Sequence, residues 1–306
     1  MFFEGTLTFN RQVPSVFQER FMYTHEQKLD SLLIELDGRP EEKYNYFHTK
    51  SLAIPSRKEI IGIIKDIQEL MFPDYFHREE NRGKSRREIL DKVFLKVKLQ
   101  ISAAYAFCGG CDCAVDTETI TYAILEKIPM IKESLIKDVQ AIYEGDPAAR
   151  SPEEIILSYP GFYAISIYRI AHEFYVARIP CISRVMTEFA HEKTGIDIHA
   201  GATIGEYFFI DHGTGIVIGE TTTIGNHVKI YQGVTLGAKS FELDADGNPV
   251  KGIKRHPDIG NNCVIYANAT ILGGNTRIGD GSVIGGNVWL THSVEPGQVV
   301  YYNNKG

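Results

Sequence analysis

The sequence predicts an α + β protein in which an all-helical N-terminal domain, residues 1–194, precedes a parallel β-helix, residues 195–306. The first observation is the distribution of glycine, because eight of the 28 glycines lie in residues 1–194 and twenty lie in residues 195–306. Glycine weakens helices and serves turns that need a positive φ, so the two regions follow different backbone rules. The second observation is the spacing of aliphatic residues, which changes from a helical period to a period of six at Gly195.

The expected helices begin at N-capping residues and continue with apolar residues at helical spacing. Ser56 precedes one such run, and the segment 151–154, Ser-Pro-Glu-Glu, combines an N-cap with a proline at the first position and acid in the first turn. A break is expected at 144–147, Glu-Gly-Asp-Pro. The same criteria predict further helices over 85–107, after Thr117, after Pro129, over 162–177 and over 183–193.

After residue 194, aliphatic residues recur every six positions, with two short slips and one long interruption. Such a repeat is typical of a parallel β-helix, in which each repeat forms a short strand and a turn and points its aliphatic residue inward. A polar excursion at 238–257 interrupts the repeat, and Asp246-Gly247 predicts a tight turn in a small hairpin there. The repeat positions are Ile198, Ile204, Ile210 and Ile216, then Ile218, Ile224, Ile230 and Leu236, then Ile259, Ile265 and Ile271, and finally Ile278, Ile284 and Leu290.

Composition excludes several classes of partner. The formal net charge is −7, which disfavours nucleic acid and anionic membrane surfaces. No apolar run approaches the roughly 18 residues of a membrane span, and the start, residues 1–5, lacks the basic and apolar pattern of a signal peptide. Five cysteines, an odd number, fit a reducing compartment better than a disulfide framework, so a cytoplasmic location is expected.

Three polar clusters in the repeat region could carry chemistry: residues 197–199, 211–215 and 255–257. Asp197 and His212 are less than one 18-residue coil apart, so we expect them to lie close together. An Asp beside a His fixes its tautomer and favours a general base. Arg255 could clamp a carboxylate with two hydrogen bonds. The alternative is that these residues are ordinary polar turn residues.

No metal site is predicted. His199, His212, His227 and His256 all lie in the repeat region, and three histidines can bind zinc, but no pair has the close fixed spacing of a ligand set. Cys108, Cys111 and Cys113 include a pair at the CxxC spacing, which is half a zinc site. An inert cluster is expected, with metal binding or redox sensing as the alternative.

The segments 194–199, 210–221, 232–237 and 255–257 together resemble the serine O-acetyltransferases, over about residues 145–295. The resemblance implies a left-handed β-helix and a homotrimer with active sites between neighbouring prisms. It also implies frequent hexamers, dimers of trimers, joined through the N-terminal helices. The implied reaction transfers acetyl from acetyl-CoA to the hydroxyl of L-serine for cysteine biosynthesis. The alternatives are an acetyltransferase for another hydroxyl acceptor, such as a sugar or homoserine, and a non-catalytic trimeric scaffold.

The resemblance also assigns roles to residues. It makes His212 the general base and Asp197 its orienting partner. Acetyl-CoA is a co-substrate and already an activated thioester, so neither a metal, nor a resident cofactor, nor a covalent acyl-enzyme is expected. The residues expected to hold serine are Asp146, Asp211, Arg255 and His256. The residues expected to contact CoA are Gly237, Ala238 and Ala267, with Lys239 or Lys254 near its phosphates and a backbone N–H near 237–238 as oxyanion donor.

The resemblance implies feedback inhibition by L-cysteine, which differs from serine in one atom. Three departures from the family pattern stand out. The excursion at 238–257 is longer than usual, Tyr266 stands where glycine is common, and the chain ends at 303–306 without a long tail. The resemblance assigns binding of O-acetylserine sulfhydrylase to such a tail, so a complex with that enzyme is not expected.

Overall fold

The computed structural model describes residues 24–38, 54–108 and 116–302, and the chain divides into two compact units, 1–51 and 52–306. In the first unit, helix α2 spans His25–Asp37. Thr24 caps this helix through a capping box with Gln27, and none of the residues of α2 is buried.

The second unit begins with the predicted helices. The side chains of Ser56, Ser85 and Ser151 each accept a hydrogen bond from a backbone N–H of the first turn, which confirms three predicted starts. The last helix ends at Gly195, which has a left-handed φ of 69°. The elements are α3 (Arg57–Met71), the 3₁₀ turn η2 (Glu79–Asn81), α4 (Arg86–Phe107), α5 (Thr117–Leu125), α6 (Ile128–Gly145), α7 (Pro152–Ser158), α8 (Pro160–Val176) and α9 (Ile182–Thr194).

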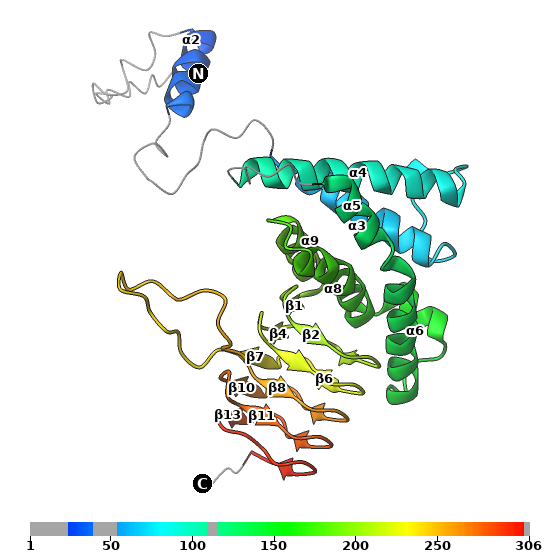
Figure 1. Ribbon diagram of the computed structural model, residues 1–306, viewed down its shortest axis with the longest axis vertical. Coiled ribbons are helices and arrows are strands. Elements are labelled where there is room, and N and C mark those ends of the chain that lie inside the picture. Colours follow the sequence, from blue (N-terminus) through cyan, green and yellow to red (C-terminus); the bar gives the residue numbers. More distant parts are fainter. Residues whose placement is uncertain (1–23, 39–53, 109–115, 303–306) are drawn as a thin grey trace, which may run out of the picture. The chain divides into compact units, whose positions relative to one another are not determined.

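The rest of this unit is a parallel β-helix of about five turns, which confirms the predicted architecture (Figure 1). Its three sheets are sheet A (β1-β4-β7-β10-β13), sheet B (β2-β5-β8-β11) and sheet C (β3-β6-β9-β12-β14). The strands are β1 (Asp197–Ile198), β2 (Thr203–Ile204), β3 (Phe209–Asp211), β4 (Val217–Ile218), β5 (Thr223–Ile224), β6 (Lys229–Tyr231), β7 (Thr235–Gly237), β8 (Asp258–Ile259), β9 (Val264–Ile265), β10 (Thr270–Leu272), β11 (Arg277–Ile278), β12 (Val283–Ile284), β13 (Trp289–Leu290) and β14 (Val299–Val300).

The strand register explains the slips in the repeat. Ile198 pairs with Ile218 and Ile218 with Leu236, so the first coil is two residues longer than the second. The extra residues lie where the chain passes from sheet C to sheet A, because five residues connect β3 to β4 and three connect β6 to β7. We call this edge of the prism the CA corner. The edge between sheets A and B is the AB corner.

The long interruption leaves the β-helix at the AB corner, between β7 and β8. An antiparallel bridge joins Leu243 to Pro249, and the backbone turns between Asp244 and Gly247. The predicted hairpin is therefore confirmed. Figure 1 shows this arm extending away from the stacked coils.

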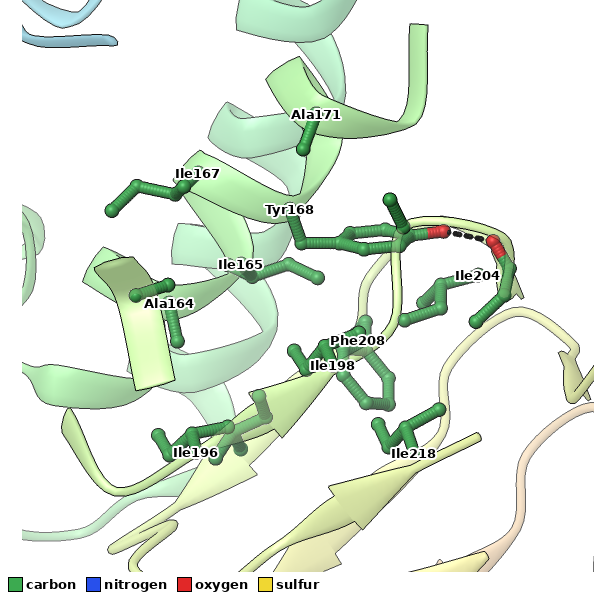
Figure 2. Close-up of a cluster of buried hydrophobic side chains, with 14 of the residues drawn as sticks. Ala164, Ile165, Ile167, Tyr168, Ala171, Ile196, Ile198, Ile204, Phe208 and Ile218 are labelled. Atoms are coloured by element: carbon green, nitrogen blue, oxygen red, sulfur yellow. Dashed lines mark hydrogen bonds between the residues drawn. The ribbon is translucent and has the colours of Figure 1, made fainter. Parts of the chain in front are cut away.

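The helices and the β-helix of this unit share one apolar core, although the predicted change from helix to strand falls at Gly195. Figure 2 shows the contact between α8 and the first coil, where Ile165 and Tyr168 face Ile198 and Phe208. The Tyr168 hydroxyl donates to the carbonyl of Ala202 at 2.6 Å. The boundary at 194/195 thus separates two kinds of secondary structure within one compact unit. In the part of the chain that the structure describes, no helix is long and apolar enough to cross a membrane.

A buried ion pair strengthens the same contact. Arg169 of α8 donates from Nε and Nη2 to the carboxylate of Asp138 of α6, at 2.7 and 2.9 Å. The same guanidinium donates to the carbonyl of Gly205, and Asp138 also accepts the N–H of Phe208. The pair therefore fixes both helices against the turn that leads into β3.

Candidate active site

His212 lies on the insertion at the CA corner. Its backbone has a φ of 58°, in the left-handed region, and its side chain is 73% exposed. The next residue, Gly213, has a φ of 88°, and a Cβ there would lie 2.5 Å from Ile196 Cδ1. Only glycine therefore fits at position 213. The two extra residues therefore lift His212 out of the regular coil into solvent, where it can reach a substrate.

Two carboxylates lie next to His212. Asp211, at the end of β3, places Oδ1 3.7 Å from His212 Nε2. Asp146 caps the C-terminus of α6, where it accepts hydrogen bonds from the Tyr159 hydroxyl at 2.7 Å and the Ala148 N–H at 2.8 Å. Burial disfavours the ionised form of Asp146, but these hydrogen bonds and a nearby lysine outweigh it and lower its pKa. The hydrogen bond between the Tyr159 hydroxyl and Asp146 raises the pKa of Tyr159 to about 12.

That lysine is Lys229 of β6. Its ammonium lies 3.3 Å from Asp211 Oδ2 and donates to the carbonyl of Gly145 at 3.0 Å. The CA corner therefore holds an exposed imidazole, two carboxylates and one cation that is already paired. A cationic group of a ligand fits this arrangement.

The second cluster lies at the AB corner and is built around Arg255. Its guanidinium pairs with Glu220, whose other oxygen accepts from the Tyr175 hydroxyl at 2.9 Å. Burial opposes ionisation of Glu220, but the hydrogen bonds from Arg255 and Tyr175 lower its pKa. Tyr175 comes from α8, so a helix fixes the carboxylate that orients the arginine. A carboxylate ligand could bind the remaining donors of this guanidinium.

His256 lies beside Arg255 and is 7% exposed. Its Nδ1 lies 3.1 Å from the N–H of Thr221 and 2.9 Å from the hydroxyl of Thr221. The threonine hydroxyl also accepts the N–H groups of Arg255 and His256. Burial and the charge of Arg255 lower the pKa of His256 to about 4, so the ring is neutral at neutral pH. Since Nδ1 faces two donors, the proton belongs on Nε2, which becomes a donor for a ligand.

The ring of His256 packs directly against Gly219. A Cβ at position 219 would lie 2.0 Å from the imidazole Cδ2, so this close approach requires glycine. His199 lies near the same cluster, with its ring 5.7 Å from that of Tyr175. Burial lowers the pKa of His199, against the raising effect of Glu220.

Asp197 lies in β1 of sheet A, and its role stays a prediction. Within the described ranges, no hydrogen bond or ion pair joins its side chain to His212, and the carboxylate beside His212 is Asp211. Asp197 instead contributes to the electrostatic environment of His199. Sequence distance placed Asp197 within one coil of His212, but the length of the insertion decides which carboxylate lies beside the imidazole.

The residues expected to contact CoA lie along both edges of sheet A. Gly237 ends β7 and Ala238 follows it at the AB corner, whereas Ala267 lies at the CA corner after β9. Lys239 and Lys254 line a cavity of about 260 Å³ at the base of the arm. Lys254 is already paired with Asp258 and the carbonyl of Thr221, so Lys239 is the better candidate for a phosphate.

Tyr266 lies beside Ala267 and stacks on Tyr231, with ring centroids 5.0 Å apart. A side chain of this size, 43% exposed, narrows the edge of sheet A at the point where Ala267 is expected to contact CoA.

The two clusters are separated on one chain. In each coil, the strand of sheet A runs from the CA corner to the AB corner. His212 lies at the CA corner, and the chain passes through Val217 and Ile218 of sheet A before it reaches the AB corner. Within the described residues, no hydrogen bond or ion pair connects His212, Asp211 or Asp146 with Arg255 or His256.

Sequence analysis missed five residues of these clusters: Tyr159, Tyr175, Glu220, Thr221 and Lys229. Glu220 and Thr221 directly follow Gly219 in a segment already singled out, and an acid followed by a hydroxyl at a glycine corner is a usable signal. Tyr159, Tyr175 and Lys229 gave no such signal in the sequence, because their hydrogen-bond partners are distant along the chain.

In the described ranges, no group of three His, Cys, Asp or Glu residues is placed to hold a metal ion. Cys111 and Cys113 lie outside the described residues, as do positions 1–5 and 303–306. Cys108 is a free thiol in contact with Cys181 at the start of α9.

An exposed imidazole with flanking carboxylates on one corner of a parallel β-helix, and an Arg–His pair on the next, define an acyltransferase of the β-helix class. Residues 88–166 match the family model "Serine acetyltransferase, N-terminal". The chain is 42% identical over 260 residues to the plasmid serine acetyltransferase of Synechococcus elongatus, covering 81% of each chain.

Two solved structures are similar over most of the chain. Serine acetyltransferase 1 of Entamoeba histolytica with L-cysteine is 39% identical, with a TM-score of 0.67 over 78% of this chain and 86% of that one. The Neisseria gonorrhoeae serine acetyltransferase with serine is 27% identical, with a TM-score of 0.54 over 79% of this chain and 95% of that one. The chain therefore belongs to the serine acetyltransferase family.

Proposed function

We propose that the protein transfers the acetyl group of acetyl-CoA to the hydroxyl of L-serine and so forms O-acetyl-L-serine for cysteine biosynthesis. The observation that carries this proposal is the complementary charge of the two corners. Asp146 and Asp211 suit the ammonium of an amino acid, and Arg255 with the Nε2–H of His256 suits its carboxylate. A sugar acceptor would use neither charge, which favours serine over that alternative.

His212 acts as the general base in this proposal. As the serine oxygen attacks the thioester carbonyl, Nε2 takes the hydroxyl proton, the new C–O bond forms and the C–S bond then breaks. The proton passes from the imidazolium to the departing CoA sulfur, so the reaction leaves no charge on the enzyme. Asp211 at 3.7 Å stabilises the transient imidazolium, and Asp197 is proposed as a second orienting carboxylate.

The two corners act together when they come from two copies of the chain. The ammonium and the carboxylate of serine are attached to one carbon, whereas the corners of a single chain are separated by the width of sheet A. A ring of three copies brings the CA corner of each chain against the AB corner of the next and closes with three equal sites. We therefore propose a homotrimer, with a hexamer as a further assembly through the helices.

Acetyl-CoA is proposed to lie between neighbouring chains along the edges of sheet A, near Gly237, Ala238 and Ala267, with Lys239 at its phosphates. L-Cysteine is proposed as a competitor for the serine site. Its ammonium and carboxylate match those of serine, and a related enzyme has been solved with L-cysteine. A cytoplasmic location is proposed from the odd number of cysteines.

The test follows release of free CoA thiol from acetyl-CoA, with L-serine, homoserine and a sugar as separate acceptors. Serine-dependent release well above that with the other acceptors is the expected result. Equal release with all acceptors would favour a broader acetyltransferase. No acceptor-dependent release from a well-folded oligomer would leave the scaffold alternative and overturn the proposal.

A further inference from the structure

Lys229 is a cation enclosed within the otherwise anionic CA corner. Its ammonium lies 3.3 Å from Asp211 Oδ2, donates to the Gly145 carbonyl at 3.0 Å, and lies over the rings of Phe209 at 4.2 Å and Tyr231 at 4.8 Å. Its side chain is 19% exposed. Two oxygens and two aromatic faces thus surround one ammonium, which leaves it little freedom to move.

The backbone at Lys229 is equally fixed. Strand β6 pairs with β3, where Lys229 is opposite Phe209, and with β9, where it is opposite Val264. The end of α6 rests on the same phenylalanine, because a Cβ at Gly145 would lie 2.8 Å from Phe209 Cε1. Lys229 therefore joins three elements at one point: the end of α6, the end of β3 and its own strand.

The contacts of Lys229 distinguish the two oxygens of Asp211. Oδ2 faces the ammonium and Oδ1 faces His212 Nε2. The hydrogen bond to Gly145 holds the residue directly before Asp146. One side chain therefore sets the rotation of one carboxylate and the position of the other.

We propose that Lys229 is a positioning residue that holds Asp211 and Asp146 in the arrangement that receives the ammonium of the substrate. The inference rests on the proposed function, because it concerns the same amino-acid site. Lys229 itself does not contact the reacting atoms.

The ammonium of Lys229 could act on serine binding in two opposite ways, by repelling the substrate ammonium or by positioning the two carboxylates. If the ammonium of Lys229 acted only by repulsion, its removal would lower the KM for serine. If Lys229 acts by positioning, its removal raises that KM, because the two carboxylates no longer converge. The sign of the change in KM therefore decides between them.

A pH profile gives a second readout. Lys229 is one of the groups that lower the pKa of Asp146, so its removal lets this carboxyl take up a proton at higher pH. Saturation with serine should then fail at higher pH as the solution is acidified. The titratable groups around the two carboxylates are Tyr159 at the start of α8, His212 at the CA corner and Lys229 of β6, and Glu154 of α7 lies near Tyr159.

The chain offers a matched control in Lys137 of α6. Its ammonium also joins α6 to the first coil, through Glu206 at 2.8 Å, and it pairs with Glu133 of its own helix at 2.9 Å; its side chain is 24% exposed. It has no contact with Asp146, Asp211 or His212. Lys137→Met therefore removes a comparable brace at a distance from the site.

The experiment compares wild type, Lys229→Met, Lys229→Arg and Lys137→Met by steady-state kinetics with each substrate varied, at several pH values. For Lys229→Met we expect a serine KM about ten- to a hundredfold higher, an unchanged KM for acetyl-CoA, and an acid limb of kcat/KM for serine at higher pH. Lys229→Arg should restore most of the loss, and Lys137→Met should match wild type in all three.

An unchanged or lower serine KM in Lys229→Met, or the same change in Lys137→Met, would overturn the inference. If Lys229→Met does not fold, Lys229→Gln is measured in its place, with the thermal shift caused by serine alone as a binding readout. Failure of the proposed function looks different, because wild type itself would then release no thiol with serine.

Discussion

The hydroxyl of Thr221 lies 2.9 Å from Nδ1 of His256, and the N–H of the same threonine lies 3.1 Å from that nitrogen. One residue thus places two donors at Nδ1 of the imidazole, so the proton lies on Nε2. The orientation and the tautomer of His256 depend on Thr221, which does not itself need to contact the substrate.

Replacing Thr221 with valine should raise the serine KM about tenfold, because the ring loses one of the two donors that set its tautomer. Thr221→Ser should restore the wild-type value. The adjacent residue gives the control, because the Thr222 hydroxyl is buried and has no hydrogen-bond partner in the described part of the chain. Thr222→Val should leave the serine KM unchanged and keep or increase stability. Equal effects of the two valine variants would contradict the assigned role.

The repeat and the helix starts were predictable because both depend on short-range rules. An aliphatic residue at every sixth position packs against its counterparts in the neighbouring coils. The caps at Ser56 and Ser151 depend only on a backbone N–H three residues later. The slip after Ile216 was visible as well, and it proves to be the insertion that carries His212.

The division of the site was not predictable in the same way. Asp197 and His212 are 15 positions apart, and whether they meet depends on the two extra residues and on their placement at one corner. Tyr175 reaches Glu220 across 45 positions, and Lys229 reaches Gly145 across 84. Such contacts follow from the packing of α6 and α8 on the first coil, which no local pattern encodes.

Stability should depend strongly on the buried pair of Asp138 and Arg169. The Asp138 side chain is fully buried, so Asp138→Asn leaves the guanidinium without its counter-charge and should cost about 3–5 kcal/mol of unfolding free energy. Denaturant unfolding gives the measurement. The exposed pair of Arg87 and Asp91 is the control, and Asp91→Asn should change the unfolding free energy far less, because solvent screens an exposed ion pair. A small loss in Asp138→Asn would mean that the pair does not hold the helices on the coil.

Acid should destabilise the fold partly through His256. Burial and the charge of Arg255 lower its pKa from 6.5 to about 4, so the unfolded chain binds a proton between these pH values that the folded chain does not. This contribution to stability is present above pH 6.5 and is lost as the pH falls toward 4. His256→Gln keeps an amide donor near the position of Nε2 and removes the titration. Its thermal midpoint should therefore fall less than that of wild type between pH 7 and 5, and an equal fall would contradict the shift.

Mixing two inactive variants should restore activity if the two corners of one site belong to different chains. His212→Ala removes the base at the CA corner, and Arg255→Ala removes the carboxylate clamp at the AB corner. After unfolding and joint refolding of equal amounts, about a quarter of the interfaces combine an intact His212 from one chain with an intact Arg255 from its neighbour. Thiol release should then return to about a quarter of the wild-type rate. The same variants refolded separately and then mixed serve as the control. If joint refolding restores nothing while wild type recovers fully, His212 and Arg255 serve one site within a single chain, and the shared-site trimer is wrong.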